Sequence, residues 1–195
     1  MPFHIDMNAI ELLTTRSSNG KLSEPAPEDP ALHVAFEAAA RAPDHGTLRP
    51  WRVRVIRGSA RERLGELMAD TLRRSTPGAS QDELTKLRQK ALRAPVILVV
   101  GAHLEPNAKI PVVEQLLAAG AAAHAMLLAF HAQGYGAIWR TGASAYDDDV
   151  KRALGFRPQD AIAGFLYVGT PKQTPPAIPR PAIETFVSEW RGPEG

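Results

Sequence analysis

Three polar segments of the sequence carry side chains that could bind an anionic ligand. They are Arg16-Ser17-Ser18, Arg41-Ala42-Pro43-Asp44-His45 and Trp139-Arg140-Thr141-Gly142. A guanidinium group matches the oxygens of a phosphate monoester, and neighbouring hydroxyl groups add neutral hydrogen-bond donors. Lone arginines at helix ends and lone serines in turns also serve as local backbone caps. Taken singly, each segment could therefore either bind an anion or cap the local backbone.

The elements predicted around these segments end where the polar residues begin. A short apolar helix over residues 10–13 precedes Arg16. Asp29 is expected to cap a second helix that carries Pro30 in its first turn and stops near Ala42, because Pro43 disfavours helical geometry in the preceding residue. The polar segments are therefore expected to be aimed by rigid elements.

The remaining pattern predicts strands separated by helices. Strands are expected at residues 51–55, 96–100, 137–140 and 162–168, where apolar residues alternate with polar ones or form β-branched runs. Two sequences that fit a capping box, residues 59–62 and 80–83, predict amphipathic helices after them. A long apolar helix is expected to begin after Pro111 and to end at Gly134 in left-handed geometry.

Length and composition limit the classes of protein. The chain has 195 residues, 44% of them hydrophobic, which predicts a single domain over residues 1–195 with an extended proline-rich arm at about 171–195. No cysteine is present, so disulfides, thiolate nucleophiles and sulfur-ligated metals are excluded, and we expect a cytoplasmic protein. Residues 1–15 do not resemble a secretory signal. The apolar stretch 116–130 is interpreted as a buried helix and not as a membrane span.

Considered together and in order, the polar segments resemble those of the FMN-dependent NAD(P)H nitroreductases, in particular their compact bacterial branch. The resemblance adds Arg49-Pro50-Trp51, Gly134-Tyr135-Gly136 and the run 164–171 (GFLYVGTP) to the three segments, and it covers nearly the whole chain. It implies an α+β fold with a central, mostly antiparallel sheet flanked by helices. It also implies an intertwined homodimer with an FMN site at each side of the interface.

The resemblance further implies which residues contact FMN. Arg16 and Ser18 would reach the phosphate and ribityl groups, with Ser17 beside them. Arg41 and His45 would flank the flavin, and Trp139, Arg140 and Thr141 would form a third contact. The sequence departs from the family pattern at Ser17, where many members have arginine, at Lys21, where arginine is common, and at Arg49, where glutamine often precedes the Pro-Trp pair.

The function implied is electron transfer from NAD(P)H through FMN to nitroaromatic or quinone-like acceptors, by a ping-pong mechanism in which the flavin carries the chemistry. No catalytic side chain is expected. One alternative is an oxidoreductase of the same fold that acts on an unknown metabolite. Another is a non-catalytic basic module that binds nucleic acid through Arg52, Arg54 and Arg57. Against this module, the net charge is only +2 and acidic residues follow the same stretch.

No metal site is expected. His124 and His131 are seven residues apart on one helix, a rise of roughly 10 Å, and are interpreted as core or interface residues. The acidic run 147–149 is expected to begin a helix, where negative charge is favoured by the helix dipole.

Overall fold

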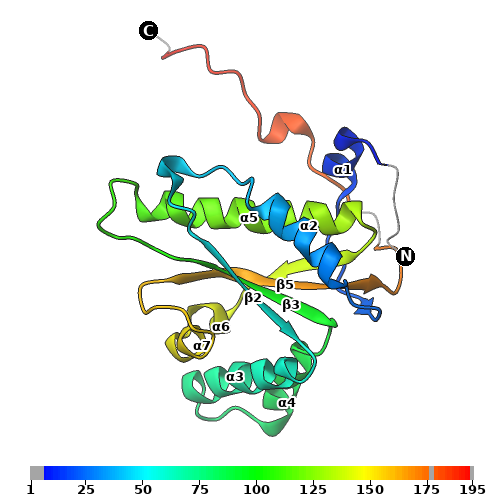
Figure 1. Ribbon diagram of the computed structural model, residues 1–195, viewed down its shortest axis with the longest axis vertical. Helices are drawn as coiled ribbons and strands as arrows, with labels where there is room; N and C mark the ends of the chain where they lie inside the picture. The colour runs from blue at the N-terminus through cyan, green and yellow to red at the C-terminus, as the bar shows by residue number, and fades with distance from the viewer. Residues whose placement is uncertain (1–6, 176–177, 194–195) are drawn as a thin grey trace.

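The computed structural model describes residues 7–175 and 178–193 (Figure 1). Its helices are α1 (Ala9–Thr15), α2 (Asp29–Ala39), α3 (Ala60–Ser75), α4 (Gln81–Lys90), α5 (Val112–Ala132), α6 (Ala143–Tyr146) and α7 (Asp148–Ala153). Its strands are β1 (Leu22–Ser23), β2 (Trp51–Arg57), β3 (Val96–Ala102), β4 (Gly136–Arg140) and β5 (Ala161–Pro171). Two 3₁₀ turns cover His45–Thr47 and Ile183–Thr185.

The strands form one antiparallel sheet centred on β5. One edge of β5 pairs with β3, which pairs in turn with the outer strand β2. The other edge of β5 pairs with β4 over residues 165–169 and with the short β1 over residues 170–171. The predicted α+β class with a mostly antiparallel sheet is confirmed.

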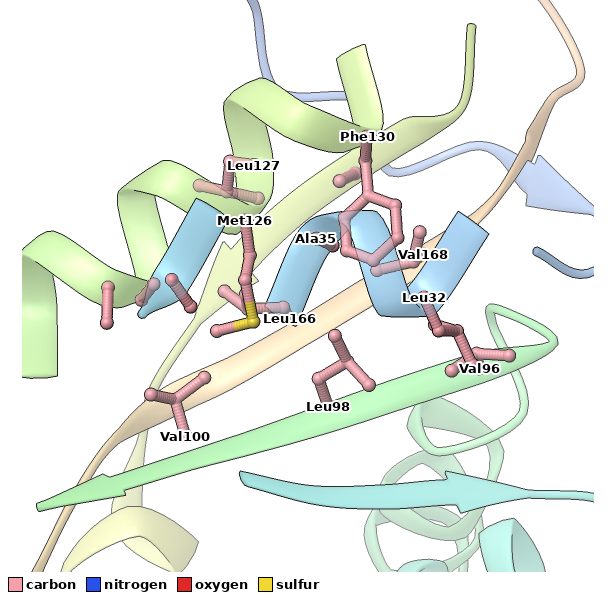
Figure 2. Close-up of a cluster of buried hydrophobic side chains, with 14 residues drawn as sticks. Leu32, Ala35, Val96, Leu98, Val100, Met126, Leu127, Phe130, Leu166 and Val168 are labelled. Atoms are coloured by element: carbon pink, nitrogen blue, oxygen red, sulfur yellow. The ribbon is translucent and has the colours of Figure 1, made fainter. Parts of the chain in front are cut away.

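Helices cover both faces of the sheet (Figure 1). On one face, α2 and α5 pack over Val96, Leu98 and Val100, together with Met126 and Phe130 (Figure 2). On the other face, Ile97 and Val99 pack in a second cluster with residues of α3 and α7. All seven residues of β3 are buried, as expected for a β-branched run covered on both sides.

Helix α5 is the predicted apolar helix, and Gly134 beyond its end has φ 80°, the left-handed geometry expected there. Its length and hydropathy alone would suit a membrane span, but one side of it forms the core. The side chain of Gln115 is buried and makes three hydrogen bonds with the backbone of the β3–α5 loop. Val113 and Leu117 remain 61% and 67% exposed, so the helix carries an uncovered apolar face within this chain.

Local capping follows the sequence prediction at one site and differs at two. Ser80 and Glu83 form the complete capping box. Ser59 has helical backbone geometry and makes no capping hydrogen bond, so the capping box predicted at residues 59–62 is wrong. The second helix begins one residue earlier than predicted: Glu28 is the N-cap, while Asp29 lies in the first turn and pairs with Arg57 at 2.7 Å. The short helix α6 was not predicted.

The C-terminal segment leaves the sheet after β5 and runs past α1, away from the rest of the chain (Figure 1). Its large apolar side chains are exposed, with Phe186 at 68% and Trp190 at 83%. Residues 176–177 and 194–195 of the predicted arm lie outside the described residues. This segment therefore carries apolar surface that the chain itself does not cover.

Candidate functional site

The segment 16–20 runs beside the edge strand β4 and is fixed to it by the backbone. The N–H of Asn19 donates to the carbonyl of Ala137 at 2.9 Å. The buried side chain of Asn19 accepts a hydrogen bond from the N–H of Lys21 and donates one to the carbonyl of Gln173. Asn19 therefore joins the segment to the chain that follows β5, and it holds Arg16 at the end of α1 in a defined place.

A cavity of about 420 Å³ lies beside Arg16, and we call it the Arg16 cavity. Its polar side chains come from the segment 16–19, from the end of α5 and from the chain after β5. No carboxylate is among the residues that line it, all of which belong to the described chain. Its polar lining residues are Arg16, Ser17, Asn19, His131, Tyr135, Gln173 and Thr174.

The electrostatics of the Arg16 cavity favour an anion. Burial and the nearby charge of Arg180 lower the pKa of Arg16. Burial and the charge of Arg16 lower the pKa of His131. Cations that disfavour one another in this way are stabilised when an anion binds between or beside them.

A second cavity, of about 540 Å³, lies on the other side of β4, and we call it the Arg140 cavity. Arg140 and Thr141 line it as β4 ends, facing Lys90 and Arg93 from the end of α4 and the turn after it. Burial raises the pKa of Tyr167 in its wall, and the charges of Arg140 and Arg93 partly oppose this. No carboxylate of the described chain lines this cavity.

Sequence reasoning missed Lys90 and Arg93. Cations at the end of a helix are favoured by the helix dipole, so their residue types carried no separate signal. Only the packing of α4 against α3 in the folded chain shows that they line the same cavity as Arg140.

The segment 16–20 lies close to both cavities. A β-carbon placed on Gly20 would lie 3.5 Å from Nη2 of Arg140. Arg16 lies at one end of this segment and the Arg140 guanidinium at the other, although they are more than a hundred residues apart in the sequence. The structure thus places Gly20, two residues after the first predicted segment, beside Arg140 of the third.

Trp139 has a different place from Arg140. Its indole lies on the opposite side of β4, where Nε1 donates to the carbonyl of Ala163 at 3.1 Å and the ring packs against the main core. Gly164 leaves room for the ring, because a β-carbon there would lie 2.0 Å from Nε1. Trp139 also lines the Arg140 cavity together with Arg140 and Thr141, so its predicted contact with the flavin stays a prediction although its ring packs against the core.

The second predicted segment lies apart from both cavities. Arg41 is exposed, and His45 is exposed and pairs through Nδ1 with Glu114 of α5 at 2.6 Å. The turn that carries His45 has left-handed backbone at Thr47 (φ 54°) and Arg49 (φ 48°), a geometry that non-glycine residues rarely adopt and that concentrates at functional sites. Within one chain, this segment and the two cavities do not form a single site.

Ser18 is also exposed, and it lines neither cavity although it lies between two residues that do. Its predicted contact with FMN stays a prediction.

The arginines of β2 do not form a free basic stripe. Arg54 donates to the carbonyls of Leu154 and Gly155 and lies over the ring of Phe156. Arg52 donates to backbone carbonyls of its own strand and turn, and Arg57 pairs with Asp29. These contacts disfavour the nucleic-acid module.

The other polar groups of interest have structural roles. Among residues 7–175 and 178–193, no three His, Asp or Glu side chains are arranged to hold a metal ion. Asp147 caps α7 as expected for an acidic helix start. His124 is exposed within the chain and His131 lines the Arg16 cavity, so neither is a core residue, and the alternative interpretation as interface residues stays a prediction.

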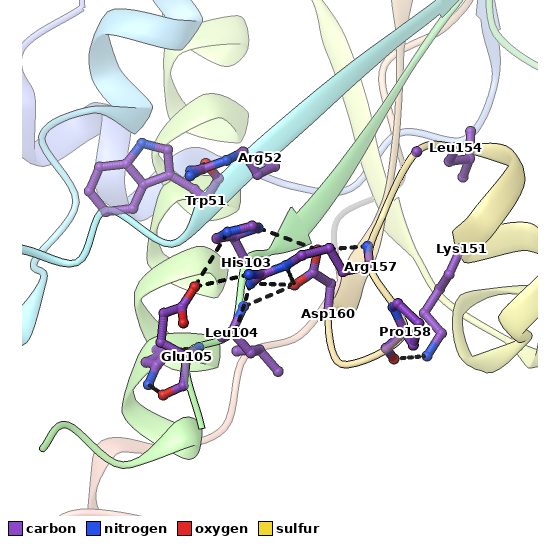
Figure 3. A network of polar contacts seen from close by, with 12 residues as sticks. Trp51, Arg52, His103, Leu104, Glu105, Lys151, Leu154, Arg157, Pro158 and Asp160 are labelled. Atoms are coloured by element: carbon purple, nitrogen blue, oxygen red, sulfur yellow. Dashed lines mark hydrogen bonds and ion pairs between the residues drawn. The ribbon is translucent and has the colours of Figure 1, made fainter. Parts of the chain in front are cut away.

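A further polar network ties β3 to the start of β5 (Figure 3). Arg157 donates to Asp160, to Glu105 and to the carbonyl of Leu104. His103 lies between the carboxylates of Glu105 and Asp160 at 3.5 and 3.4 Å. Because each carboxylate also pairs with Arg157, this network fixes one end of the sheet.

The architecture and the site together define an α+β protein with an antiparallel sheet and two cationic cavities beside the edge strand β4. The family model described as "Nitroreductase family" matches residues 13–170, and the chain belongs to this family of oxidoreductases. YdjA of Escherichia coli (strain K12), whose name places it among the NAD(P)H nitroreductases, is 43% identical over 85% of this chain and 90% of its own.

Solved structures agree with this assignment. A nitroreductase-like family protein from Bacillus cereus has the same fold, with a TM-score of 0.82 and 21% identity over 96% of this chain and 98% of its own. A nitroreductase-type protein from Desulfovibrio desulfuricans, crystallised in complex with FMN, has a TM-score of 0.73 and 25% identity over 95% of this chain and 98% of its own.

Proposed function

We propose that this chain is an FMN-dependent oxidoreductase that takes electrons from NAD(P)H and passes them to flat, electron-poor acceptors such as nitroaromatics or quinones, by a ping-pong mechanism. Family membership supports the reaction class. The single observation that supports FMN as the cofactor is that Arg16 and Arg140 both lie at the segment 16–20, beside two cavities that no carboxylate of the described chain lines.

The donor set of the site fits FMN. The Arg16 cavity offers a guanidinium, a hydroxyl and amide groups, which suit the phosphate and ribityl chain of the cofactor. The Arg140 cavity offers cations and hydroxyls beside apolar walls from Leu72, Leu87 and Phe165, which suit a planar ring with polar edges. FMN in the Desulfovibrio relative is consistent with this fit.

Bound FMN would supply the hydride and electron-transfer chemistry, and the chain would supply position and charge. Lys90, Arg93 and Arg140 create a positive potential in their cavity, which stabilises negative charge there without any proton transfer. Arg41 lines neither cavity and Lys21 donates to the side chain of Gln173, so the Arg140 cavity offers the better set of cations for this role.

The proposed working form is an intertwined homodimer with two sites across its interface. Arg41 and His45 reach neither cavity of their own chain, so in this proposal they complete the site of the partner. Two uncovered apolar surfaces support an interface: the face of α5 with Val113 and Leu117, and the C-terminal segment with Phe186 and Trp190. Both would be buried by a second copy. A single domain and a cytoplasmic location remain part of the proposal.

Purification tests the cofactor first. The protein should be yellow, with the visible absorption band of oxidised flavin, and heat should release FMN and not FAD. Sedimentation at micromolar concentration should show a dimer. Steady-state rates with NAD(P)H and a panel of acceptors should give parallel double-reciprocal lines for nitroaromatics or quinones. A colourless protein that binds no added flavin, or a stable monomer with full activity, would refute the shared-site proposal.

A further inference from the structure

His131 lies in the wall of the Arg16 cavity, close to the end of α5, and neither the sequence motifs nor the family resemblance gives it a role. It is half-buried, and its Nε2 atom lies 3.2 Å from Oγ1 of Thr15. Thr15 is the last residue of α1 and immediately precedes Arg16. One contact therefore links the histidine to the residue next to the predicted phosphate ligand.

The hydrogen bonds of Thr15 fix the protonation pattern of His131. Oγ1 of Thr15 also lies 2.6 Å from the carbonyl of Glu11, which can only accept, so the hydroxyl proton is donated there. The hydroxyl oxygen of Thr15 can then only accept a hydrogen bond from His131, so Nε2 of the neutral ring carries the hydrogen. The neutral ring has its lone pair on Nδ1, and a proton taken up by the ring adds at this atom.

The surroundings of the ring disfavour that proton when the cavity holds no anion. Burial and the charge of Arg16 on the neighbouring helix both act against the imidazolium form. Arg180, from the C-terminal segment, adds a second cation close to Arg16. No carboxylate of the described chain lines the cavity to offset these charges.

We propose that the Arg16 cavity receives the phosphate group of FMN as a dianion, and that His131 takes up one proton as the phosphate binds. The inference rests on the proposed function, since it assigns a binding residue and a proton to the same cofactor. A phosphate monoester carries close to two negative charges near neutral pH, because its second pKa is about 6. Such a charge offsets the cations Arg16 and Arg180 and favours the charged form of the histidine beside it.

The sign of the pH dependence follows. A proton that the complex holds more tightly than the free protein strengthens binding below the pKa of the complex, and this gain is lost as the pH rises through that pKa. A change of one unit in the pKa of the histidine corresponds to about a tenfold change in affinity. The phosphate has the opposite dependence, because below about pH 6 it gains a proton and loses charge.

The test measures dissociation constants by the quenching of flavin fluorescence, with apoprotein and either FMN or riboflavin, between about pH 6 and pH 8.5, a range that spans the titration of histidine. The variant His131→Gln keeps an N–H donor for Thr15 and removes the titration. The control is His33→Gln, because His33 lies exposed on α2 and pairs only with Glu37. Circular dichroism checks that each variant is folded.

The ratio of the FMN dissociation constants of His131→Gln and the unmutated protein should rise severalfold above one at the acidic end, with a limit of about ten for each unit of change in the pKa, and should be close to one at the alkaline end. The ratio isolates His131, because the titration of the phosphate affects both proteins alike. Riboflavin, which has no phosphate, and His33→Gln should give ratios close to one throughout.

Calorimetry of the unmutated protein at neutral pH, in two buffers with different ionisation enthalpies, provides a measurement that needs no variant. FMN binding should take up protons and riboflavin binding should not. A ratio that is constant with pH, or equal proton uptake with riboflavin, would overturn the inference while the proposed cofactor stands. Failure of the unmutated protein to bind FMN at any pH would overturn both.

Discussion

Replacement of Arg16 by alanine tests the assignment of the phosphate site most directly. The guanidinium is half-buried beside the Arg16 cavity and lies close to Arg180, and no carboxylate lines that cavity. The lowered pKa of Arg16 means that the folded apoprotein disfavours this charge, chiefly because of burial. Arg16→Ala should therefore leave the free energy of unfolding of the apoprotein unchanged or slightly raised.

The same substitution should weaken FMN binding strongly. A hydrogen bond between charged groups contributes about 1.5 to 3 kcal/mol, which corresponds to an increase of about 10- to 150-fold in the dissociation constant. Riboflavin affinity should change little, because the lost group faces the phosphate. The affinities are measured by flavin fluorescence, and the stability of the apoprotein by urea unfolding.

Arg63→Ala is the matched control, since Arg63 is exposed on α3, lines neither cavity and donates a hydrogen bond to Ser59 at the start of the same helix. Equal losses of FMN and riboflavin affinity in Arg16→Ala would show that the residue supports the fold of the site and not the phosphate. An unchanged FMN affinity in a folded Arg16→Ala protein would refute the reasoning, because the phosphate would then be held elsewhere.

Three further substitutions have defined outcomes. His45→Ala should raise the dissociation constant of FMN while His33→Ala does not; equal affinities would remove His45 from the site. Gly164→Ala places a β-carbon 2.0 Å from Nε1 of Trp139 and should lower the free energy of unfolding by about 1–3 kcal/mol. Gly78→Ala, where no atom lies within 4 Å, should be nearly neutral, and equal urea midpoints for the two glycine variants would contradict the packing described. Burial alone raises the pKa of Asp160, but hydrogen bonds from the Arg157 side chain and from two backbone N–H groups outweigh it, so the pKa is lowered. The stability that this carboxylate contributes is present above its unfolded pKa of about 3.9 and is lost as the pH falls below that value. Asp160→Asn should therefore lower the free energy of unfolding by about 1.5–3 kcal/mol at neutral pH, and by progressively less below about pH 4. A difference in unfolding free energy between Asp160→Asn and the unmutated protein that does not vary with pH would contradict this prediction.

The amino-acid sequence by itself determined most of the secondary structure. The β-branched run 96–100, the apolar helix that ends before Gly134 and the capping box at Ser80 depend on neighbours a few residues away, and all three were predicted correctly. Capping was wrong at Ser59 because this residue takes helical geometry, a local alternative that the sequence pattern does not distinguish. The three polar segments and the fold class were likewise accessible, through their order along the chain.

Only the tertiary structure decided which charges share a cavity. The packing of α4 against α3 brings Lys90 and Arg93 to the cavity of Arg140, and the contact of α1 with α5 brings His131 to the cavity of Arg16. The two sides of β4 separate Trp139 from Arg140, although they are adjacent in the sequence, because successive residues of a strand point to opposite faces. Residue types show which side chains can bind an anion, but the long-range packing that places them, and the field that acts on a buried histidine, exist only in the folded chain.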